Sequence, residues 1–297
     1  MFKNKVAKEH QEQQYIHLID DILKYGSDEQ GRNGNTKVII GCTMYFSLSN
    51  KIIPLLTTKK VAWKTCLKEL LWFIKGQTNN KILKAHGCYI WNANSSKEFL
   101  KSRGLPYNED DLGPVYGHQW RHFNAEYTDC NEQYNGKGID QLQYIIDCLK
   151  DKDKRKSRRL VMSAWNPCQL DEMALPPCHI LVQFHVTNDN LLSCSMFQRS
   201  GDVGLGVPFN IASYSFLLHL IAKHCDLVPH EFYYHLGNAH IYEEHIEPLK
   251  VQLTRIPTAF PTIEITTVRD NISDYVIDDF KIFNYKYCEK IKMDMKA

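Results

Sequence analysis

The residue best suited to nucleophilic attack is Cys178, which lies in the segment Met173–His179. Because proline fixes the backbone, Pro176 and Pro177 would hold the thiol rigidly at the entry to a predicted strand. The chain contains ten cysteines, however, and a single cysteine is more often a small buried hydrophobic residue. This segment alone therefore leaves the buried role as the commoner interpretation.

Arginines at the ends of predicted strands are suited to binding an anion. The segment 150–159 reads KDKDKRKSRR, which is usually a solvated loop, but Arg158 and Arg159 directly precede an apolar strand. Arg199 precedes Ser200 at the end of another strand. Guanidinium groups and a hydroxyl suit phosphate oxygens. The spacing alone does not show that these residues meet.

The segment Ser200–Asn210 is rich in glycine, but its order matches neither the dinucleotide-binding fingerprint nor a P-loop. The glycines would instead permit tight turns or the close approach of a flat ligand. Asn210 precedes an apolar helix, where an asparagine is most commonly a helix cap. Its amide is both donor and acceptor, so pairing with a nucleobase edge is the alternative.

His240 and Tyr242 are separated by one residue in an extended segment, so both side chains would lie on one face. A hydrogen-bonded core pair is slightly the commoner interpretation, and a binding role is the alternative. None of the cysteines forms a CxxC pair or has the Cys/His spacing of a zinc site, so no metal site is predicted.

The composition is typical of a globular protein with one large domain or two ordinary ones: 297 residues, 43% hydrophobic and 24% charged. The net charge of +2 gives no global reason to expect nucleic-acid or membrane binding. The polar N-terminus lacks the apolar core of a signal peptide, and the apolar stretch around 216–222 is too short to cross a bilayer. Reduced thiols in the cytoplasm are therefore expected, and a nuclear or mitochondrial location is also consistent with the sequence.

The elements that must position these residues follow from hydrophobic periodicity. A loose tail is expected through about Gln14. Apolar residues at helical spacing predict helices over 15–25, 61–75, 140–150 and 211–225. Strands are predicted over 37–48, 160–165, 179–187 and 191–200, with strand and loop beyond 261. Helices mixed with hairpin-linked strands predict an α+β fold in a single domain.

The strand 179–187 has a clean alternation. It predicts one face with Ile180, Val182, Phe184 and Val186, and an opposite face with His179, Gln183 and His185.

Taken together, these segments resemble thymidylate synthases along nearly the whole chain, from about Glu12 to Ala297. Several motifs occur in the order of that family, which is far more specific than any one of them. They are Pro54–Lys60, Glu69–Phe73, Asp111–Gly117, Ser157–Arg159, Met173–His179, Gln198–Asp202, Leu205–Tyr214 and the closing tail Lys290–Met295.

The resemblance implies one synthase domain over residues 1–297, with a large mixed sheet flanked by helices and one sheet face used for homodimerisation. It implies methylation of dUMP to dTMP, with 5,10-methylenetetrahydrofolate as cosubstrate, dihydrofolate as the second product and no metal. Cys178 would add to C6 of uracil and turn C5 into a carbon nucleophile, since C5 is otherwise a poor one. An adjacent arginine would favour the thiolate.

The resemblance also assigns roles to individual residues. Beside Cys178, the catalytic residues would be Glu69 for the proton network, Tyr116 near the C5 proton, Arg199 and Asp202. The residues that bind dUMP would be Arg32, Gln198, Arg199 and Ser200, Asn210 for uracil, His240 and Tyr242 for the ribose, and Arg158 and Arg159 from the other subunit of an obligate homodimer. The residues that bind the folate would be Trp91, Leu175, Asp202, Gly206, Phe209 and Ala297.

The chain departs from the family pattern at five positions: Gly31, Asn33, Asn92, Phe197 and Asn238. These changes would affect turnover or folate affinity rather than the nucleophile. Two alternatives stay open. A pyrimidine hydroxymethylase is disfavoured, because those relatives have an acid in place of Asn210. A non-catalytic protein that binds RNA or a second subunit is supported only by the departures and the basic run, and nucleic-acid binding beyond weak contact with mRNA is not expected.

Overall fold

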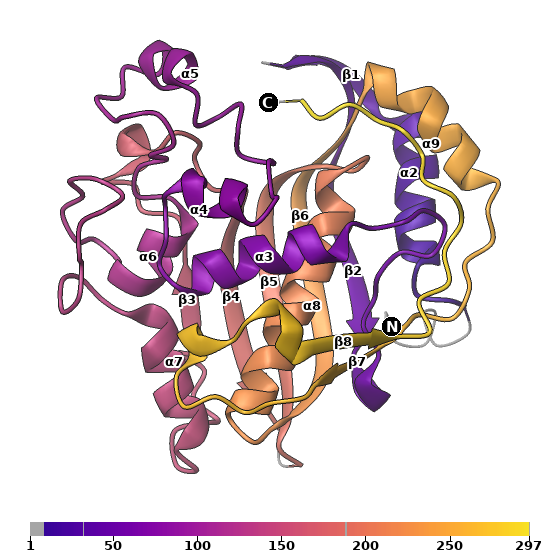
Figure 1. The fold of residues 1–297 in the computed structure, drawn as a ribbon. Helices are drawn as coiled ribbons and strands as arrows, with labels where there is room; N and C mark the ends of the chain where they lie inside the picture. Colours follow the sequence, from indigo (N-terminus) through magenta and orange to yellow (C-terminus); the bar gives the residue numbers. More distant parts are fainter. Residues whose placement is uncertain (1–8, 32, 188, 297) are drawn as a thin grey trace.

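A six-stranded mixed sheet forms the centre of the structure, in the order β1-β2-β6-β5-β4-β3 (Figure 1). The computed structural model describes residues 9–31, 33–187 and 189–296. The neighbouring strands are antiparallel except β5 and β6, which are parallel. The strands are β1 (Ser27–Gly31), β2 (Gly34–Ser47), β3 (Val161–Ser163), β4 (His179–Val186), β5 (Leu191–Asp202) and β6 (Val228–Tyr242).

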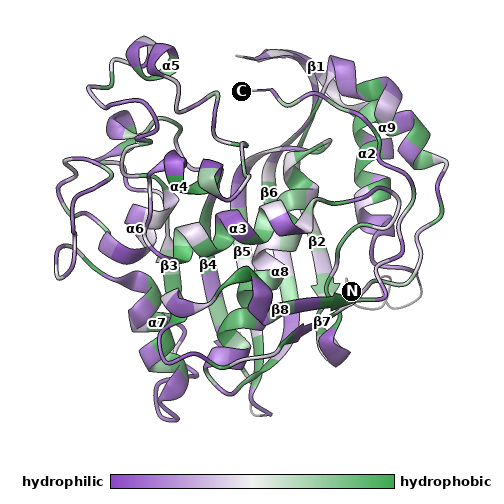
Figure 2. Cartoon of the chain, in the orientation of Figure 1, coloured by the Kyte–Doolittle hydropathy of each residue, from purple (hydrophilic) through white to green (hydrophobic). Residues whose placement is uncertain are grey.

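Two long helices are layered on one face of this sheet. Helix α8 (Gly206–His224) packs against β5 and β6, and α3 (Trp63–Ile74) packs on α8. Because α8 lies between two layers, it is buried along most of its length, which explains its continuous apolar sequence. Figure 2 shows hydrophobic residues along the strands and these helices.

The remaining elements surround this three-layer centre. They are α2 (Gln13–Tyr25), α4 (Asn80–Ala85), α5 (Lys97–Ser102), α6 (Tyr116–His122), α7 (Gln141–Lys150), α9 (Ile246–Leu253), and the separate hairpin of β7 (Thr262–Ile265) and β8 (Phe280–Phe283). The C-terminal segment then runs back past α9 and α2 (Figure 1), and its last described residues line the cavity described below. The predicted α+β class with a mixed sheet is confirmed.

The segment expected to be a loose tail is fixed by Glu12 before α2 begins at Gln13. The Glu12 side chain is fully buried. Its carboxylate accepts hydrogen bonds from the backbone N–H and the hydroxyl of both Thr57 and Thr58, at 2.6–2.8 Å. The expectation of a loose segment through Gln14 was therefore wrong for Glu12–Gln14, because hydropathy alone does not show that a carboxylate has buried donors.

The alternation predicted for strand β4 fails at its first residue. Val182 and Phe184 are buried as expected, but His179 is buried too. The register of β4 against β5 shifts between His179 and Leu181, so a bulge turns the imidazole into the core. A β-bulge places one extra residue in the strand and shifts the alternation of its side chains. The hydrophobic pattern of the sequence does not show where such a bulge lies.

The sheet face opposite α8 carries partly exposed apolar side chains. Leu181 pairs with Phe197 across β4 and β5, and their exposed fractions are 38% and 41%. We call this surface the open sheet face; it comprises Thr43, Tyr45, Leu181, Gln183, Ser195, Phe197, Tyr233 and His235, which are neighbours in the strand register. None of the helices in the described part of the chain is long and apolar enough to span a bilayer.

Candidate functional site

One cavity of about 860 Å³ gathers most of the residues singled out by the sequence. It lies where the C-terminal half of β5, the end of β6, the start of α8 and the segment before β4 meet. The predicted site residues that line it are Glu69, Trp91, Tyr116, Leu175, Cys178, Gln198, Arg199, Ser200, Asp202, Gly206, Phe209, Asn210, His240 and Tyr242.

Cys178 lies directly before β4 and is held there through its backbone. Its N–H donates a 2.7 Å hydrogen bond to the hydroxyl oxygen of Tyr116. Its carbonyl accepts a 2.8 Å bond from the backbone N–H of Arg199 on β5. Two elements far apart in sequence therefore fix the position of the thiol.

The Arg199 side chain reinforces that position. Nε donates to the carbonyl of Pro177 at 2.8 Å, and Nη2 donates to the carbonyl of Pro176 at 3.0 Å. Nη2 also lies 3.7 Å from the sulfur of Cys178. A guanidinium at this distance stabilises a thiolate, which is the nucleophilic form of cysteine.

Glu69 lies on α3 among buried residues, and its side chain lines the inner wall of the cavity. Burial raises the pKa of its carboxyl to about 7, although the Trp91 indole N–H favours the ionised form by donating to Oε1 at 2.7 Å. A carboxyl that titrates near neutrality can both accept and return a proton under physiological conditions.

A stack of buried rings lies behind Cys178. The His179 ring stacks on Tyr116 at 4.1 Å, and its Nδ1 lies 2.8 Å from the hydroxyl of Tyr214. Burial lowers the pKa of His179 to about 3 and raises that of Tyr116 well above its ordinary value. Both rings are therefore neutral, and they position Cys178 without adding charge.

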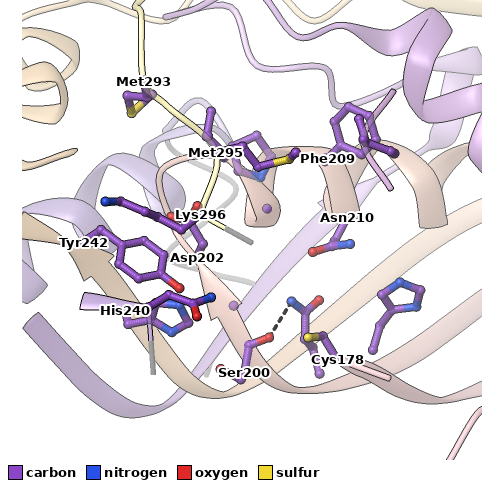
Figure 3. A pocket seen from close by; sticks show the side chains of 18 of the residues that line it. Cys178, Ser200, Asp202, Phe209, Asn210, His240, Tyr242, Met293, Met295 and Lys296 are labelled. Carbon is purple, nitrogen blue, oxygen red and sulfur yellow. Dashed lines mark hydrogen bonds between the residues drawn. The ribbon is translucent and has the colours of Figure 1, made fainter. Parts of the chain in front are cut away.

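The opposite wall is formed by the end of β6. Alternation places Asn238, His240 and Tyr242 on the cavity side, as predicted for the last two (Figure 3). Asn238 Oδ1 lies 3.0 Å from His240 Nδ1. Burial lowers the pKa of His240, with partial opposition from Asp202, so the ring is mainly neutral.

The start of α8 supplies a third wall. The helix begins at Gly206, so Asn210 lies inside it and is not its cap; the capping interpretation was wrong. Asn210 and Phe209 both line the cavity, and Figure 3 shows them on the side away from His240. The amide of Asn210 is thus available to a ligand.

Two of the expected residues, Arg158 and Arg159, lie away from this cavity. Both are exposed and are not among the residues that line it. Arg32 and Ala297 lie outside the described residues. Among the departures, Gly31, Asn33 and Asn238 line the cavity.

The other two departures point elsewhere. The Asn92 side chain accepts a hydrogen bond from Asn80 at 3.1 Å, and neither Asn92 nor Phe197 lines the cavity. Phe197 lies on the open sheet face.

Sequence reasoning did not name Lys59 or the side chains of the C-terminal segment as site residues, although it identified Lys290–Met295 as a closing tail. Lys59 is buried, and its amine donates to the carbonyl of Gly204. Burial lowers the pKa of Lys59 to about 8, partly offset by Asp202 and Glu12. The motif that contains Lys59 was recognised, but a lysine in sequence gives no sign of burial. The tail side chains that line the cavity are Lys290, Ile291, Met293, Met295 and Lys296.

The cavity combines a positioned thiol, a carboxyl with a pKa near neutrality and an amide inside a helix, with aromatic rings around them. This set suits covalent catalysis on a flat heterocycle. In the part of the chain that the structure describes, no group of three or more His, Cys, Asp or Glu side chains is arranged to hold a metal ion.

Comparison with known proteins identifies relatives along nearly the whole chain. A family model described as "Thymidylate synthase" matches residues 13–297. The chain is 49% identical over 292 residues to "Bifunctional dihydrofolate reductase-thymidylate synthase" of Zea mays, covering 98% of this chain and 55% of that protein.

Two further relatives differ in length. The bifunctional protein of Plasmodium chabaudi is 50% identical over 292 residues, covering 98% of this chain and 49% of that protein. "Thymidylate synthase" of Human herpesvirus 8 type P is 49% identical over 288 residues, covering 96% of this chain and 84% of that protein. The chain therefore spans about half the length of these bifunctional relatives and most of the viral one.

Proposed function

Because the chain belongs to the thymidylate synthase family, we propose that it methylates dUMP to dTMP and converts 5,10-methylenetetrahydrofolate to dihydrofolate. The observation that carries this proposal is the geometry around Cys178. Its sulfur lies 3.7 Å from Arg199 Nη2, in the same cavity as Glu69 and Asn210.

Cys178 begins the reaction by adding its thiolate to C6 of the uracil ring. The electron pair of the C5–C6 double bond moves toward the C4 carbonyl, so C5 becomes a carbon nucleophile. C5 attacks the methylene carbon of the folate and forms a carbon–carbon bond. Loss of the C5 proton and cleavage of the bond between that carbon and the folate nitrogen release tetrahydrofolate, whose hydride completes the methyl group and leaves dihydrofolate. After the C5 proton is lost and the methyl group is complete, the sulfur leaves C6 and the double bond is restored.

Glu69 manages the proton transfers around this adduct. Its carboxyl has a pKa of about 7, so both protonation states are available at neutral pH. In the proton-bearing form it can donate toward the pyrimidine carbonyl as charge develops there. In the ionised form it can accept a proton, directly or through water.

The nucleotide is recognised by the walls of the cavity. Asn210 donates to O4 and accepts from N3–H of uracil, a pattern that cytosine does not match. His240 and Tyr242 bind the ribose hydroxyl, and Arg199, Ser200 and Arg32 bind the phosphate. Gln198 is a further residue of the dUMP site. The proposed folate site comprises Trp91, Leu175, Asp202, Gly206, Phe209 and Ala297, with Asp202 on the pterin ring.

We also propose that residues 1–297 form one synthase domain that acts as a homodimer through the open sheet face. The exposed pair Leu181 and Phe197 would be buried between two copies. Arg158 lies beside this face, because its carbonyl accepts a 2.8 Å hydrogen bond from Gln183. Dimerisation there would carry Arg158 and Arg159 to the phosphate site of the partner.

None of the ten cysteines forms a disulfide, which is typical of a reducing compartment. A cytoplasmic location is proposed on this basis.

The test supplies the protein with dUMP and methylenetetrahydrofolate and measures the formation of dihydrofolate by its ultraviolet absorbance. Activity is expected in the native enzyme and should vanish in Cys178→Ala. No activity in a folded native protein, and no covalent capture of 5-fluoro-dUMP with the folate, would favour the binding-protein alternative. Asn210→Asp should lose dUMP turnover and gain turnover of dCMP; an unchanged preference would remove Asn210 from the specificity role.

A further inference from the structure

His245 lies between the cavity and the C-terminal segment. It ends the short 3-10 turn Glu243–His245 after β6, and its side chain is 1% exposed. Its Nε2 lies 2.8 Å from the carbonyl oxygen of Asp294, and its Nδ1 lies 3.6 Å from Asp202 Oδ1. The imidazole of His245 thus faces both the Asp202 carboxylate, which lines the cavity, and the backbone carbonyl of Asp294 near the chain end.

The residues around this imidazole allow it to lie close to the Asp202 carboxylate. The Gly204 N–H donates to Asp202 Oδ1 at 2.8 Å, and the Gly204 carbonyl accepts from the buried amine of Lys59. A Cβ at Gly204 would lie 2.7 Å from His245 Nδ1 and 3.1 Å from Asp202 Oδ1. Only glycine leaves room for the ring and the carboxylate to approach each other.

Only the imidazolium form of His245 interacts favourably with both the Asp294 carbonyl and the Asp202 carboxylate. A carbonyl oxygen can only accept, so Nε2 must carry a hydrogen. In the neutral ring, Nδ1 would then point a lone pair at the Asp202 carboxylate. In the cation, Nδ1 carries the second hydrogen and the charge is opposite to that of Asp202.

Other charged groups around the ring do not remove this preference. Burial alone would lower the pKa of His245, but Asp202, the Asp294 carbonyl and Glu244 raise it above its ordinary value. Lys296 forms a 2.6 Å ion pair with Glu244, and Lys292 lines the small cavity beside the ring. Tyr242 contacts the ring edge-on at 5.7 Å, and His240 is near enough to interact electrostatically. Lys59 is a further cation near Asp202.

The C-terminal segment held by this contact forms part of the cavity wall. Met293 and Met295, on either side of Asp294, both line the cavity (Figure 3). A second contact of the tail end, the ion pair of Lys296 with Glu244, involves more exposed side chains, with exposed fractions of 26% and 58%. Exposed ion pairs contribute little, so the buried contact to His245 is the stronger fixed point.

We propose that His245 is a positioning residue that couples the Asp202 carboxylate to the C-terminal segment. As an imidazolium it holds the Asp294 carbonyl and the Asp202 carboxylate together, so that the folate site is complete only when both contacts are made. Its role in folate binding rests on the proposed function, whereas its hold on the tail does not.

The kinetic test compares His245→Phe and His245→Gln with the native enzyme. His245→Phe is expected to raise the KM for the folate by about tenfold, the effect of losing a charge-assisted hydrogen bond, with dUMP affinity unchanged. His245→Gln keeps one donor for the Asp294 carbonyl, so it should recover part of that loss. An unchanged folate KM, or an equal loss of dUMP affinity, would show that His245 only fills the core.

The pH dependence of the KM for the folate tests the charge of His245. Because the pKa of His245 is raised, the imidazolium persists at low pH and is lost as the pH rises through that pKa. The KM for the folate should therefore rise in the native enzyme as the pH increases through the raised pKa of His245, and the corresponding step should be absent in His245→Gln. The same step in both proteins would overturn the proposal.

A second test does not depend on enzyme activity. Trypsin cleavage after Lys290 and Lys292 is followed by mass spectrometry in ligand-free protein. Cleavage should be faster in His245→Phe than in the native chain, and unchanged in the control Glu247→Gln, which alters an exposed ion pair on the adjacent helix. Equal cleavage in all three would show that His245 does not hold the tail, whatever reaction the protein catalyses.

Discussion

The guanidinium of Arg199 lies 3.7 Å from the sulfur of Cys178 and also holds the two carbonyls that precede it, those of Pro176 and Pro177. One side chain therefore both stabilises the thiolate and fixes the backbone that carries it. The proposed phosphate ligand is thus also part of the nucleophile's support, which links substrate binding to the reactivity of the cysteine.

Arg199→Lys should separate these roles. A lysine keeps the charge, but it cannot donate to two carbonyls and face the sulfur in the same fixed geometry. Alkylation of Cys178 by iodoacetamide at neutral pH should slow by about tenfold, which corresponds to the loss of one hydrogen bond to a charged group. Peptide mass spectrometry, with Cys178→Ala as background, distinguishes this thiol from the other cysteines. An unchanged rate would show that the charge alone suffices.

Trp91→Phe should shift the pH dependence of the reaction. The indole N–H donates to the ionised carboxylate of Glu69, so its removal raises the pKa of that carboxyl above the present value of about 7. If the ionised form is required, the acid limb of kcat/KM moves to higher pH. Glu69→Gln should abolish that limb and lower kcat by roughly 10²- to 10⁴-fold.

The matched control for this experiment is Trp72→Phe. Trp72 is also buried, but its indole N–H donates to the carbonyl of Asn79 rather than to Glu69. The control should leave the acid limb where it is. A shift of the same size in both variants would mean that disturbed core packing, and not loss of the hydrogen bond to Glu69, moves the acid limb.

Glu12→Ala should destabilise the fold although Glu12 lies outside the cavity. Its removal leaves four buried donors of Thr57 and Thr58 without their acceptor. The free energy of unfolding should fall by about 3–5 kcal/mol, as expected when one side of a buried charged network is lost. Urea denaturation measures this value. Glu9→Ala, at an exposed position nearby, should change it by less than about 0.5 kcal/mol.

Mixed dimers should test whether two subunits share each site. Cys178→Ala and the double variant Arg158→Ala/Arg159→Ala are expected to be severely impaired when assayed alone. When the two proteins are unfolded and refolded together, each mixed dimer contains one site with an intact thiol and intact partner arginines. Activity should return to about a quarter of the native value, because half the dimers are mixed and each has one complete site. No recovery would indicate that each chain uses its own arginines.

The local elements could be predicted from sequence because their causes are local. Helices α3, α7 and α8 begin and end within five residues of the expected bounds, since apolar residues recur at helical spacing. The bulge at His179 and the buried carboxylate of Glu12 could not be predicted in the same way. Both depend on partners in other elements, Gln198 for the register and Thr57 and Thr58 for the hydrogen bonds.

The sequence by itself determined which residues were available for chemistry, because the order of its motifs resembles one enzyme family. Only the tertiary structure decided which of them meet. Arg199 reaches Cys178 because β4 pairs with β5, and His245 reaches Asp294, 49 residues away, because the chain end folds back over the cavity. Residue types are written in the chain, whereas contacts between distant segments depend on the packing of the whole fold. The burial that raises the pKa of Glu69, and the balance of burial and the Asp202 charge at His245, follow from that packing.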